Sequence, residues 1–370
     1  APTSRVRILE VDAGREWRGG QNQVRLLCRE LAGRPGVELR LITRRDGELA
    51  RRAAAAGVFV HEVPWTFGID PRAMVRTAAL IRSFMPDVVH VHDSHAFSVV
   101  RFALASVITK DRNSWLPYLR WFRMNAPLPA LVASRRVDFH VTRRSNWFRA
   151  DRVIAVSEAV KRVLIADGLP ERDIVVVHDG IDPAEVRAAA DAAPGIRGRL
   201  GLPAGVPLAV NVAALVDHKD QRTLIRAAAA ARALAPALHW VIAGAGPLHA
   251  ALAAEAARLG IADRVHLVGF VDGVDALIRE AGVFVMSSKE EGMGSVVLHA
   301  AALERPVVAT AAGGLAEIVP PAWQVPVGDA DALARKVASA LTHPSPVPLP
   351  PDCTAAAMAD RVLAQYRLLA

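Results

Sequence analysis

Short apolar runs alternate along this chain with longer amphipathic stretches. The run at 7–11 is followed by Gly19-Gly20 and then by a stretch at 21–31 whose apolar residues recur at helical spacing. The runs of the first half that predict strands are 7–11, 37–42, 87–92, 152–156 and 174–177, and those of the second half are 208–212, 239–243, 265–268, 283–286 and 306–309. Strands that alternate with helices predict parallel sheets with both faces covered.

The pattern is interrupted once, which predicts two α/β domains. A chain of 370 residues is also longer than one hydrophobic core usually serves. After Gly180-Ile181-Asp182 the composition turns to Ala, Gly and Pro through about Pro207, and this stretch is expected to be a linker. The predicted domains are 1–184 and 185–343, followed by a proline-rich strap at 344–353 and a last helix within 354–370 that docks back on the first domain.

The positive charge is concentrated in the first half. Residues 1–185 hold 29 Lys/Arg and 21 Asp/Glu, which accounts for the whole net charge of +8. The segment 101–152 alone has 11 basic and three acidic residues. Such a patch favours an anionic partner, whether nucleic acid, acidic lipid or a phosphorylated substrate, but a solvated face of an Arg-rich chain explains it equally well.

Three glycine-containing loops stand where a predicted strand gives way to a helix. They are 14–23, 242–247 and 287–300. Ligands of open parallel sheets bind beyond the carboxyl ends of the strands, and glycines let backbone N–H groups approach an anion. Each loop alone could equally be a tight turn. Glu291 in the third loop could accept hydrogen bonds from sugar hydroxyls or favour the helix start, and both interpretations stay open.

Several segments, taken in order, form a recognisable series. They are Gly19-Gly20, Val89-His90-Val91-His92, the segment 150–157, the segment 178–182, Gly244 to Pro247, Val268 to Phe270, the segment 291–319, and the proline strap with a last helix containing Tyr366. This series closely resembles the GT-B glycosyltransferases, in particular glycosyltransferase family 4, over nearly the whole chain. The segment 291–319 resembles that family's donor-site signature.

The resemblance implies two Rossmann-like domains that face each other across a cleft. It also implies retaining transfer of a sugar from a nucleotide donor without a metal ion or cofactor. The donor would bind the C-terminal domain and the acceptor the N-terminal one. By the resemblance, Lys219 would neutralise the leaving diphosphate and Glu291 would hold the sugar. The expected donor-binding residues are Gly19, Gly20, Gly244, Gly246, Gly269, Gly292, Met293, Gly294, Ser295, Val296 and His299.

Two positions depart from the family pattern. His299 stands where the family usually has a second glutamate that binds the ribose hydroxyls, and a neutral imidazole offers only one donor and one acceptor. Ala214 stands where the family usually has an arginine, for which Arg15 or Arg18 could substitute. Either the donor pocket is altered, or the protein binds sugar nucleotides poorly and has another role.

The acidic residues of the second half are better explained as helix caps than as metal ligands. Asp329 and Asp331 directly precede an expected helix, where capping is the better interpretation. Asp272 and Asp275 are likewise expected to form a turn and a cap. Cys28 and Cys353 have no spacing typical of zinc or a redox pair, and they fit a reducing compartment.

The acceptor side is expected in the first domain. The candidates are His92, His95, Arg135 and Arg136, with Arg143 and Arg144 as further contacts to acceptor phosphates. The segment 115–123 combines Trp115, Leu119 and Phe122 on one helical face with arginines, which suits either a membrane interface or a helix that covers the core. The histidines could equally be plain strand-end residues.

The leading hypothesis is a retaining glycosyltransferase that acts on a cell-envelope-type acceptor, lipid-linked or anionic, or on a small molecule. It predicts a cytoplasmic protein, since no apolar run is long enough to span a bilayer. It also predicts affinity for the inner face of the cytoplasmic membrane and no nucleic-acid partner. The second hypothesis is a catalytically weak GT-B relative that binds sugar nucleotide or membrane. A GT-B epimerase or phosphorylase is a weaker third.

Overall fold

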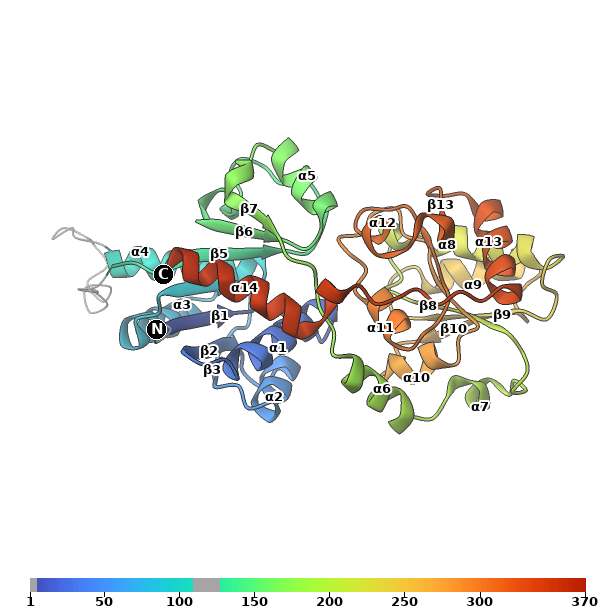
Figure 1. Ribbon diagram of the computed structural model, residues 1–370, viewed down its shortest axis with the longest axis horizontal. Coiled ribbons are helices and arrows are strands. Elements are labelled where there is room, and N and C mark those ends of the chain that lie inside the picture. The colour runs from blue at the N-terminus through green and yellow to red at the C-terminus, as the bar shows by residue number, and fades with distance from the viewer. Residues whose placement is uncertain (1–4, 109–126) are drawn as a thin grey trace. The chain divides into compact units, whose positions relative to one another are not determined.

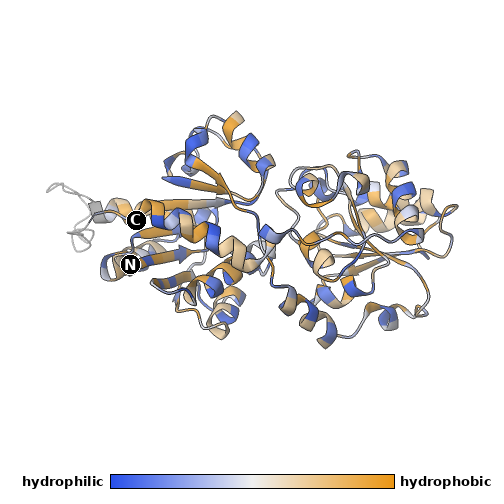
Figure 2. Cartoon of the chain, viewed as in Figure 1, coloured by the Kyte–Doolittle hydropathy of each residue, from blue (hydrophilic) through white to orange (hydrophobic). Residues whose placement is uncertain are grey.

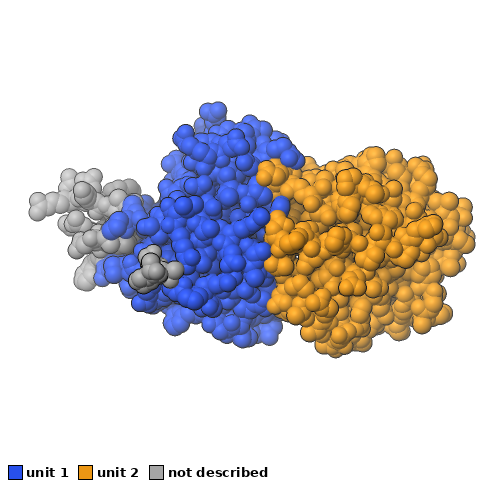
Figure 3. Space-filling model, viewed as in Figure 1, with its two compact units in different colours: residues 1–156, 160–180, 355–370 blue, residues 157–159, 181–354 orange. Residues whose placement is uncertain are grey.

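The computed structural model describes residues 5–108 and 127–370, which divide into two compact units (Figure 1). Unit 1 comprises the chain up to Val156 together with 160–180 and 355–370, and unit 2 comprises 157–159 and 181–354 (Figure 3). The expected segment 115–123 lies outside the described residues.

The described part of unit 1 contains a seven-stranded parallel sheet in the order β3-β2-β1-β4-β5-β6-β7. Its strands are β1 (Val6–Val11), β2 (Val37–Arg44), β3 (Val60–Val63), β4 (Val88–Val91), β5 (Ala130–Arg135), β6 (Arg152–Ala155) and β7 (Ile174–Val176). The central strand β1 pairs with β2 and β4, so that Ile8 lies between Leu39 and Val88. The strand order therefore reverses between β1 and β4.

Helices cover both faces of this sheet. They are α1 (Gly19–Ala32), α2 (Glu48–Ala55), α3 (Pro71–Phe84), α4 (Ser94–Ile108), α5 (Glu158–Ala166) and α14 (Ala355–Leu369), with short 3-10 turns at Asn146–Arg149 and Glu171–Asp173. α14 packs beside α1, and the two share one core in which Leu27, Leu31 and Tyr366 are buried. α3 and α4 pack against each other. The expected return of the last helix to the first α/β unit is thus observed.

The described part of unit 2 contains a six-stranded parallel sheet in the order β10-β9-β8-β11-β12-β13. Its strands are β8 (Leu208–Val212), β9 (His239–Ala243), β10 (Val265–Gly269), β11 (Val283–Met286), β12 (Val307–Thr310) and β13 (Gln324–Val325). Here the order reverses between β8 and β11. The strands are largely apolar, whereas the helices present both apolar and polar residues, as expected for sheets covered on two faces (Figure 2).

The described part of unit 2 also contains helices. They are α6 (Pro183–Ala192), α7 (Ile196–Leu200), α8 (Gln221–Ala231), α9 (His249–Arg258), α10 (Val274–Arg279), α11 (Val296–Ala302), α12 (Leu315–Ile318) and α13 (Ala330–Thr342), with 3-10 turns at Asp217–Lys219, Pro321–Trp323 and Pro351–Cys353. α8 packs against α9 and α13, and α10 packs against α6 and α11.

The segment expected to be a linker, which follows Asp182 and ends at about Pro207, instead contains two helices, α6 and α7. Asp182 caps α6 by accepting hydrogen bonds from the backbone N–H groups of Ala184 and Glu185, and Pro183 occupies the first helical position. Alanine is the best helix former, so an Ala-rich segment with such a start is helical.

Candidate active site

Lys219 and Glu291 meet where the strand order of unit 2 reverses, the place where open parallel sheets bind their ligands. Lys219 follows β8, and Glu291 follows β11. The Lys219 Nζ donates to Glu291 Oε2 at 2.5 Å, and the two side chains are 18% and 10% exposed. The fold therefore brings together the two residues that the resemblance singled out for catalysis.

Neighbouring hydroxyls and amides hold the Glu291 segment in place. Ser288 Oγ donates to Glu291 Oε2 at 3.1 Å, and the Gly314 N–H donates to the Glu291 carbonyl at 2.9 Å. Thr310, at the end of β12, donates in turn to the Ser288 carbonyl at 2.7 Å. The carboxylate is thus fixed by groups from two adjacent strand ends. Ser288 was missed in the sequence because a serine in a loop carries no distinguishing pattern.

The loop that carries Lys219 is tied to the same segment. Ser287 Oγ donates to the Lys219 carbonyl at 3.0 Å, and the Lys289 N–H donates to the His218 carbonyl at 2.8 Å. Asp220 takes a left-handed backbone conformation and caps α8 by accepting from Thr223. These bonds fix the path of the lysine's backbone before any ligand arrives.

The loop 292–295 needs its glycines. Gly294 has φ +76°, and a Cβ at Gly314 would lie 2.2 Å from the Gly292 carbonyl oxygen. Gly292, Met293 and Gly294 are buried, whereas Ser295 and Val296 are half-buried at the start of α11. The loop is therefore pressed against its neighbour on one side and reached by solvent at its end.

The glycines after β9 and β10 pack the loops together. A Cβ at Gly244 would lie 1.9 Å from the Ala213 carbonyl oxygen, and one at Gly246 would lie 2.4 Å from that of Leu215. The Gly244 N–H donates to the Gly269 carbonyl at 2.7 Å. These glycines support the loop that follows β8, and their predicted contact with the donor stays a prediction.

His299, on α11, bonds to Asp275, on α10. The His299 Nδ1 and Asp275 Oδ1 atoms lie 2.6 Å apart. The expectation that Asp275 caps a helix is wrong, because Gly273 occupies the N-cap of α10 and the Asp275 side chain turns to His299. The two residues are 24 positions apart, so no local pattern announces the contact.

Asp329, Ala214, Arg15 and Arg18 all have hydrogen-bond partners within the protein. The Asp329 side chain accepts from the Ala332 N–H at 2.8 Å and caps α13, as predicted. The Ala214 carbonyl accepts from the Gln221 side chain at 2.9 Å. Of the two arginines suggested as substitutes for the missing cation, Arg18 pairs with Glu16, and Arg15 donates to the Thr66 carbonyl.

In unit 1, the reversal between β1 and β4 places the glycine pair and two strand-end histidines on neighbouring connections. Gly19 and Gly20 open α1, and a Cβ at Gly20 would meet no atom within 4 Å. His95 is exposed near the start of α4. These positions suit a ligand at the carboxyl edge of this sheet.

His92 and Arg136 are less accessible than the sequence suggested. The His92 Nε2–H donates to Glu10 at 2.7 Å, and Arg136 donates to the other ring nitrogen at 3.2 Å. Burial, with the neighbouring His90, lowers the pKa of His92 to about 3, so the ring is neutral. Arg136 also pairs with Asp179 at 3.2 Å. Both ring nitrogens of His92 therefore already have partners.

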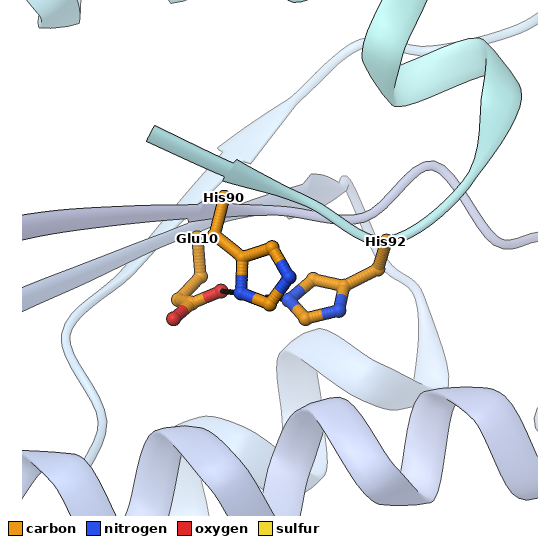
Figure 4. Close-up of side chains that lie close together, drawn as sticks. All are labelled: Glu10, His90 and His92. Atoms are coloured by element: carbon orange, nitrogen blue, oxygen red, sulfur yellow. Dashed lines mark hydrogen bonds and ion pairs between the residues drawn. The ribbon is translucent and has the colours of Figure 1, made fainter. Parts of the chain in front are cut away.

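Glu10 lies at the centre of this buried network (Figure 4). It accepts from Tyr366 of α14 at 2.7 Å, and His90 bonds to Tyr366 and to Ser134 at 2.5 and 2.8 Å. Burial alone would raise the pKa of Glu10, but His90 and His92 outweigh it and hold the pKa below its usual range. Glu10, His90 and His92 lie close enough to share a metal ion, yet hydrogen bonds within the network account for their ligand atoms.

Asp12 and Asp93 are two neighbouring carboxylates in unit 1, and the sequence did not indicate that they lie close together. Asp93 accepts from the backbone N–H groups of Ala13, His95 and Ala96 at 2.7 to 2.9 Å. Asp12 accepts from the Gly14 N–H at 2.8 Å. Burial, with the nearby charge of Asp93, raises the pKa of Asp12 to about 6.

The other three arginines proposed to contact the acceptor differ in their surroundings. Arg135 donates to the Phe139 carbonyl at 2.7 Å and lies 5.4 Å from the centre of the Trp147 ring. Arg143 and Arg144 are exposed. Within residues 5–108 and 127–370, none of the helices combines the length and the apolar character needed to cross a membrane.

Comparisons with known proteins agree with this architecture. A profile of the Glycosyl transferases group 1 matches residues 194–358, and one of Glycosyltransferase Family 4 matches residues 17–185. The crystal structure of HepE from Anabaena in complex with UDP-glucose has a TM-score of 0.72 and 18% identity, covering 99% of this chain and 97% of that one. The protein is therefore a glycosyltransferase of the GT-B fold. It belongs to glycosyltransferase family 4.

Two curated relatives illustrate the range of the similarity. The 2-deoxystreptamine N-acetyl-D-glucosaminyltransferase of Streptomyces fradiae is 29% identical over 336 residues, which cover 85% of this chain and 76% of the relative. The lipopolysaccharide core biosynthesis glycosyltransferase LpsE of Rhizobium meliloti is 31% identical over 150 residues, which cover 38% of this chain and 41% of the relative.

Proposed function

We propose that this protein is a retaining, metal-independent glycosyltransferase whose unit 2 binds a nucleoside-diphosphate sugar. The contact of Lys219 with Glu291 at the strand-order reversal of unit 2 carries the proposal. It puts a half-buried cation and a buried carboxylate, whose side chains keep 18% and 10% of their exposure, at the edge where a parallel sheet binds ligands.

The two charges suit the two parts of a sugar nucleotide. A diphosphate gains negative charge as its bond to the sugar breaks, and the Lys219 ammonium would compensate that charge, as a divalent cation does elsewhere. Backbone N–H groups at the solvent-reached end of the loop 292–295 would add donors. The Glu291 carboxylate can only accept hydrogen bonds, which sugar hydroxyls provide.

Similarity supports the finer points of the donor chemistry. The HepE structure holds UDP-glucose on the same fold, which supports a nucleoside-diphosphate sugar as the donor of this chain. The resemblance of the segment 291–319 to the donor signature of family 4 supports retention of the anomeric configuration. Transfer with retention requires the acceptor hydroxyl to form its bond on the face from which the diphosphate leaves.

The acceptor is proposed to be a sugar or cyclitol, either free or linked to a lipid of the cell envelope. The names of the relatives point to 2-deoxystreptamine and to the lipopolysaccharide core. The basic surplus of residues 1–185, with Arg143 and Arg144 exposed, would favour an anionic acceptor or an anionic membrane surface on the cytoplasmic side.

A catalytically weak relative is the second candidate, and Ala214 and His299 are the observations in its favour. Against it, Lys219 and Glu291 are both present and in contact, and the curated relatives are named as transferases. An epimerase would act on the donor alone, and a phosphorylase would use phosphate in place of a hydroxyl acceptor, so analysis of the products formed without a hydroxyl acceptor distinguishes both.

A donor panel tests the proposal. Thermal unfolding is measured with UDP, GDP, ADP and TDP, and sugar release is then followed with glucose and N-acetylglucosamine esters of the nucleotide that stabilises most. Lys219→Ala should lower turnover by roughly 10- to 100-fold, because it removes a charge-assisted hydrogen bond of about 1.5–3 kcal/mol. Activity should survive EDTA.

Lys161→Ala is the matched control, since it removes a lysine from another Lys–Glu pair, with Glu171, at 3.0 Å. Its turnover should equal that of the wild type. Absence of binding by all four nucleotides, or full activity of Lys219→Ala, would contradict the proposal. NMR of the product should show the anomeric configuration of the donor, and an inverted product would contradict retention.

A further inference from the structure

A cavity of about 430 Å³ lies at the amino edge of the sheet of unit 1. Its walls come from the first residues of β1 and β2, the chain just before β4 and the end of α3. Such a volume is in the range of small-molecule sites. None of the residues proposed to bind the donor or the acceptor lines it. The charged groups that do line it are Arg5, Arg7, Arg40, Glu38 and Asp87.

The two carboxylates of the cavity each have an arginine partner. Asp87 accepts from the backbone N–H of Arg7 at 2.7 Å and from its guanidinium at 3.3 Å. The same guanidinium donates to the Phe84 carbonyl at 3.3 Å, at the end of α3. Glu38 accepts from Arg5 at 2.5 Å. Each negative charge is therefore balanced by one arginine, and one positive charge of the cavity is left over.

The remaining arginine is Arg40, on β2. Its guanidinium carbon lies 4.2 Å from the centre of the Phe84 ring and 5.3 Å from that of Phe59, and its contact with Glu38 is 3.8 Å, too long for a hydrogen bond. Within residues 5–108 and 127–370 this guanidinium has no hydrogen bond, although the side chain is only 28% exposed. A charged group so largely removed from water calls for an acceptor.

We propose that this cavity binds a small organic acid whose carboxylate pairs with Arg40. A guanidinium presents its N–H groups in one plane and matches the two oxygens of a carboxylate, and one unbalanced positive charge matches one carboxylate. Phe84 and Met85 supply apolar lining for the rest of the molecule. This ligand is neither donor nor acceptor, so the inference goes beyond the proposed function and does not rest on it. Because the cavity joins β1, β2 and α3, the bound acid would stabilise unit 1.

The experiment compares benzoate with benzamide, which has nearly the same shape but no charge. Saturation-transfer difference NMR at pH 7 measures the Kd of each probe for the full chain. The wild type should bind benzoate saturably, with the weak affinity expected of so small a ligand, and benzamide roughly 10-fold less tightly. Arg40→Gln should bind benzoate no better than the wild type binds benzamide.

Glu38→Gln tests the charge balance in the opposite direction. It keeps the size of the side chain but removes the negative charge beside Arg5 and Arg40, so the affinity for benzoate should rise a few-fold. Arg152→Gln is the matched control, because Arg152 begins β6 at the same edge of the sheet, outside the cavity, and donates to the Arg172 carbonyl at 3.1 Å. That variant should bind benzoate as the wild type does.

A purely structural role for Arg40, packed on Phe84, predicts no binding of the acid and no gain in Glu38→Gln. The inference is overturned if the wild type does not bind benzoate saturably, if benzamide binds equally well, or if Arg40→Gln keeps the wild-type affinity. Should Arg40→Gln fail to fold, as judged by circular dichroism, an unchanged or lower affinity in Glu38→Gln overturns it. Loss of benzoate binding in Lys219→Ala would place the probe at the donor site and overturn it as well.

Discussion

Asp12 occupies a position that is costly for a carboxylate. Burial and the charge of Asp93 raise its pKa to about 6 from a usual value near 3.8, so the free energy of unfolding decreases as the pH rises from about 4 through 6. We expect Asp12→Asn to stabilise unit 1 at pH 8 by about 2 to 3 kcal/mol. The gain should shrink to near zero at pH 4, measured by urea unfolding at both pH values.

Asp93→Asn serves as the contrasting variant. Asp93 accepts three backbone N–H bonds at the start of α4, so its neutralisation should destabilise at pH 8. If Asp12→Asn were instead destabilising at pH 8, the carboxylate would have a favourable structural role. Asp12 accepts hydrogen bonds from the Gly14 N–H and from the side chain of Gln21, the residue after the glycine pair. A carboxyl group that is kept at a cost to stability is commonly one that serves function.

At the residue scale, the sequence shows which residues stand in a motif but not which side chains surround them in the fold. Lys219 and Glu291 stood out because their motifs are local, and the sheet order then brings them together. His92 and His95 had the same pattern in the sequence, yet one is buried against Glu10 and the other is exposed. The difference arises from Glu10 on a neighbouring strand, which no spacing reveals.

At the element scale, the hydroxyl of Tyr366 fastens α14 to the sheet of unit 1. It donates to the buried carboxylate of Glu10 at 2.7 Å and bonds to His90 at 2.5 Å. Tyr366→Phe keeps the aromatic ring but removes one of the hydrogen-bond donors to the Glu10 carboxylate. The free energy of unfolding of unit 1 should fall by roughly 1.5–3 kcal/mol, and amide exchange should quicken in α14.

Ser134→Ala is the matched control for this prediction. It removes a hydroxyl that bonds to His90 in the same network but does not contact the charge, so it should cost only about 1 kcal/mol. An equal cost for the two variants would mean that the bond to the Glu10 carboxylate is no stronger than a neutral one.

Long regular elements were predictable, and short or tertiary-dependent ones were not. The strands at 208–212, 239–243 and 283–286 match their expected bounds because each is an apolar run ended by turn residues. β13 was not predicted, since it has only two residues and its pairing with β12 defines it. Neither was α6, whose Ala-rich sequence fits a linker and a capped helix equally well.

At the scale of the whole molecule, unit 1 should be sensitive to acid because of His92. Its pKa is lowered to about 3 by burial and by His90, against a usual value of 6.5. Between these values the unfolded chain binds a proton that the folded one does not, so the free energy of unfolding falls as the pH falls, by up to about 1.4 kcal/mol per pH unit. Glu10, whose pKa is held below its usual 4.5, adds to the loss below that pH.

Asp12 opposes this trend, because below pH 6 its carboxylate binds a proton in the folded state before it does so in the unfolded chain. The change in the pKa of Asp12 is smaller than the change in the pKa of His92, so the effect of His92 prevails. Urea unfolding from pH 7 to 4 should therefore show a net loss for unit 1. His92→Gln cannot titrate, so its unit 1 transition should lose about 1 kcal/mol less per pH unit. His249→Gln, at an exposed site in unit 2, should follow the wild type. If the His92 variant keeps the wild-type slope, the buried ring is protonated in the folded state, and Glu10 is then paired with a cation.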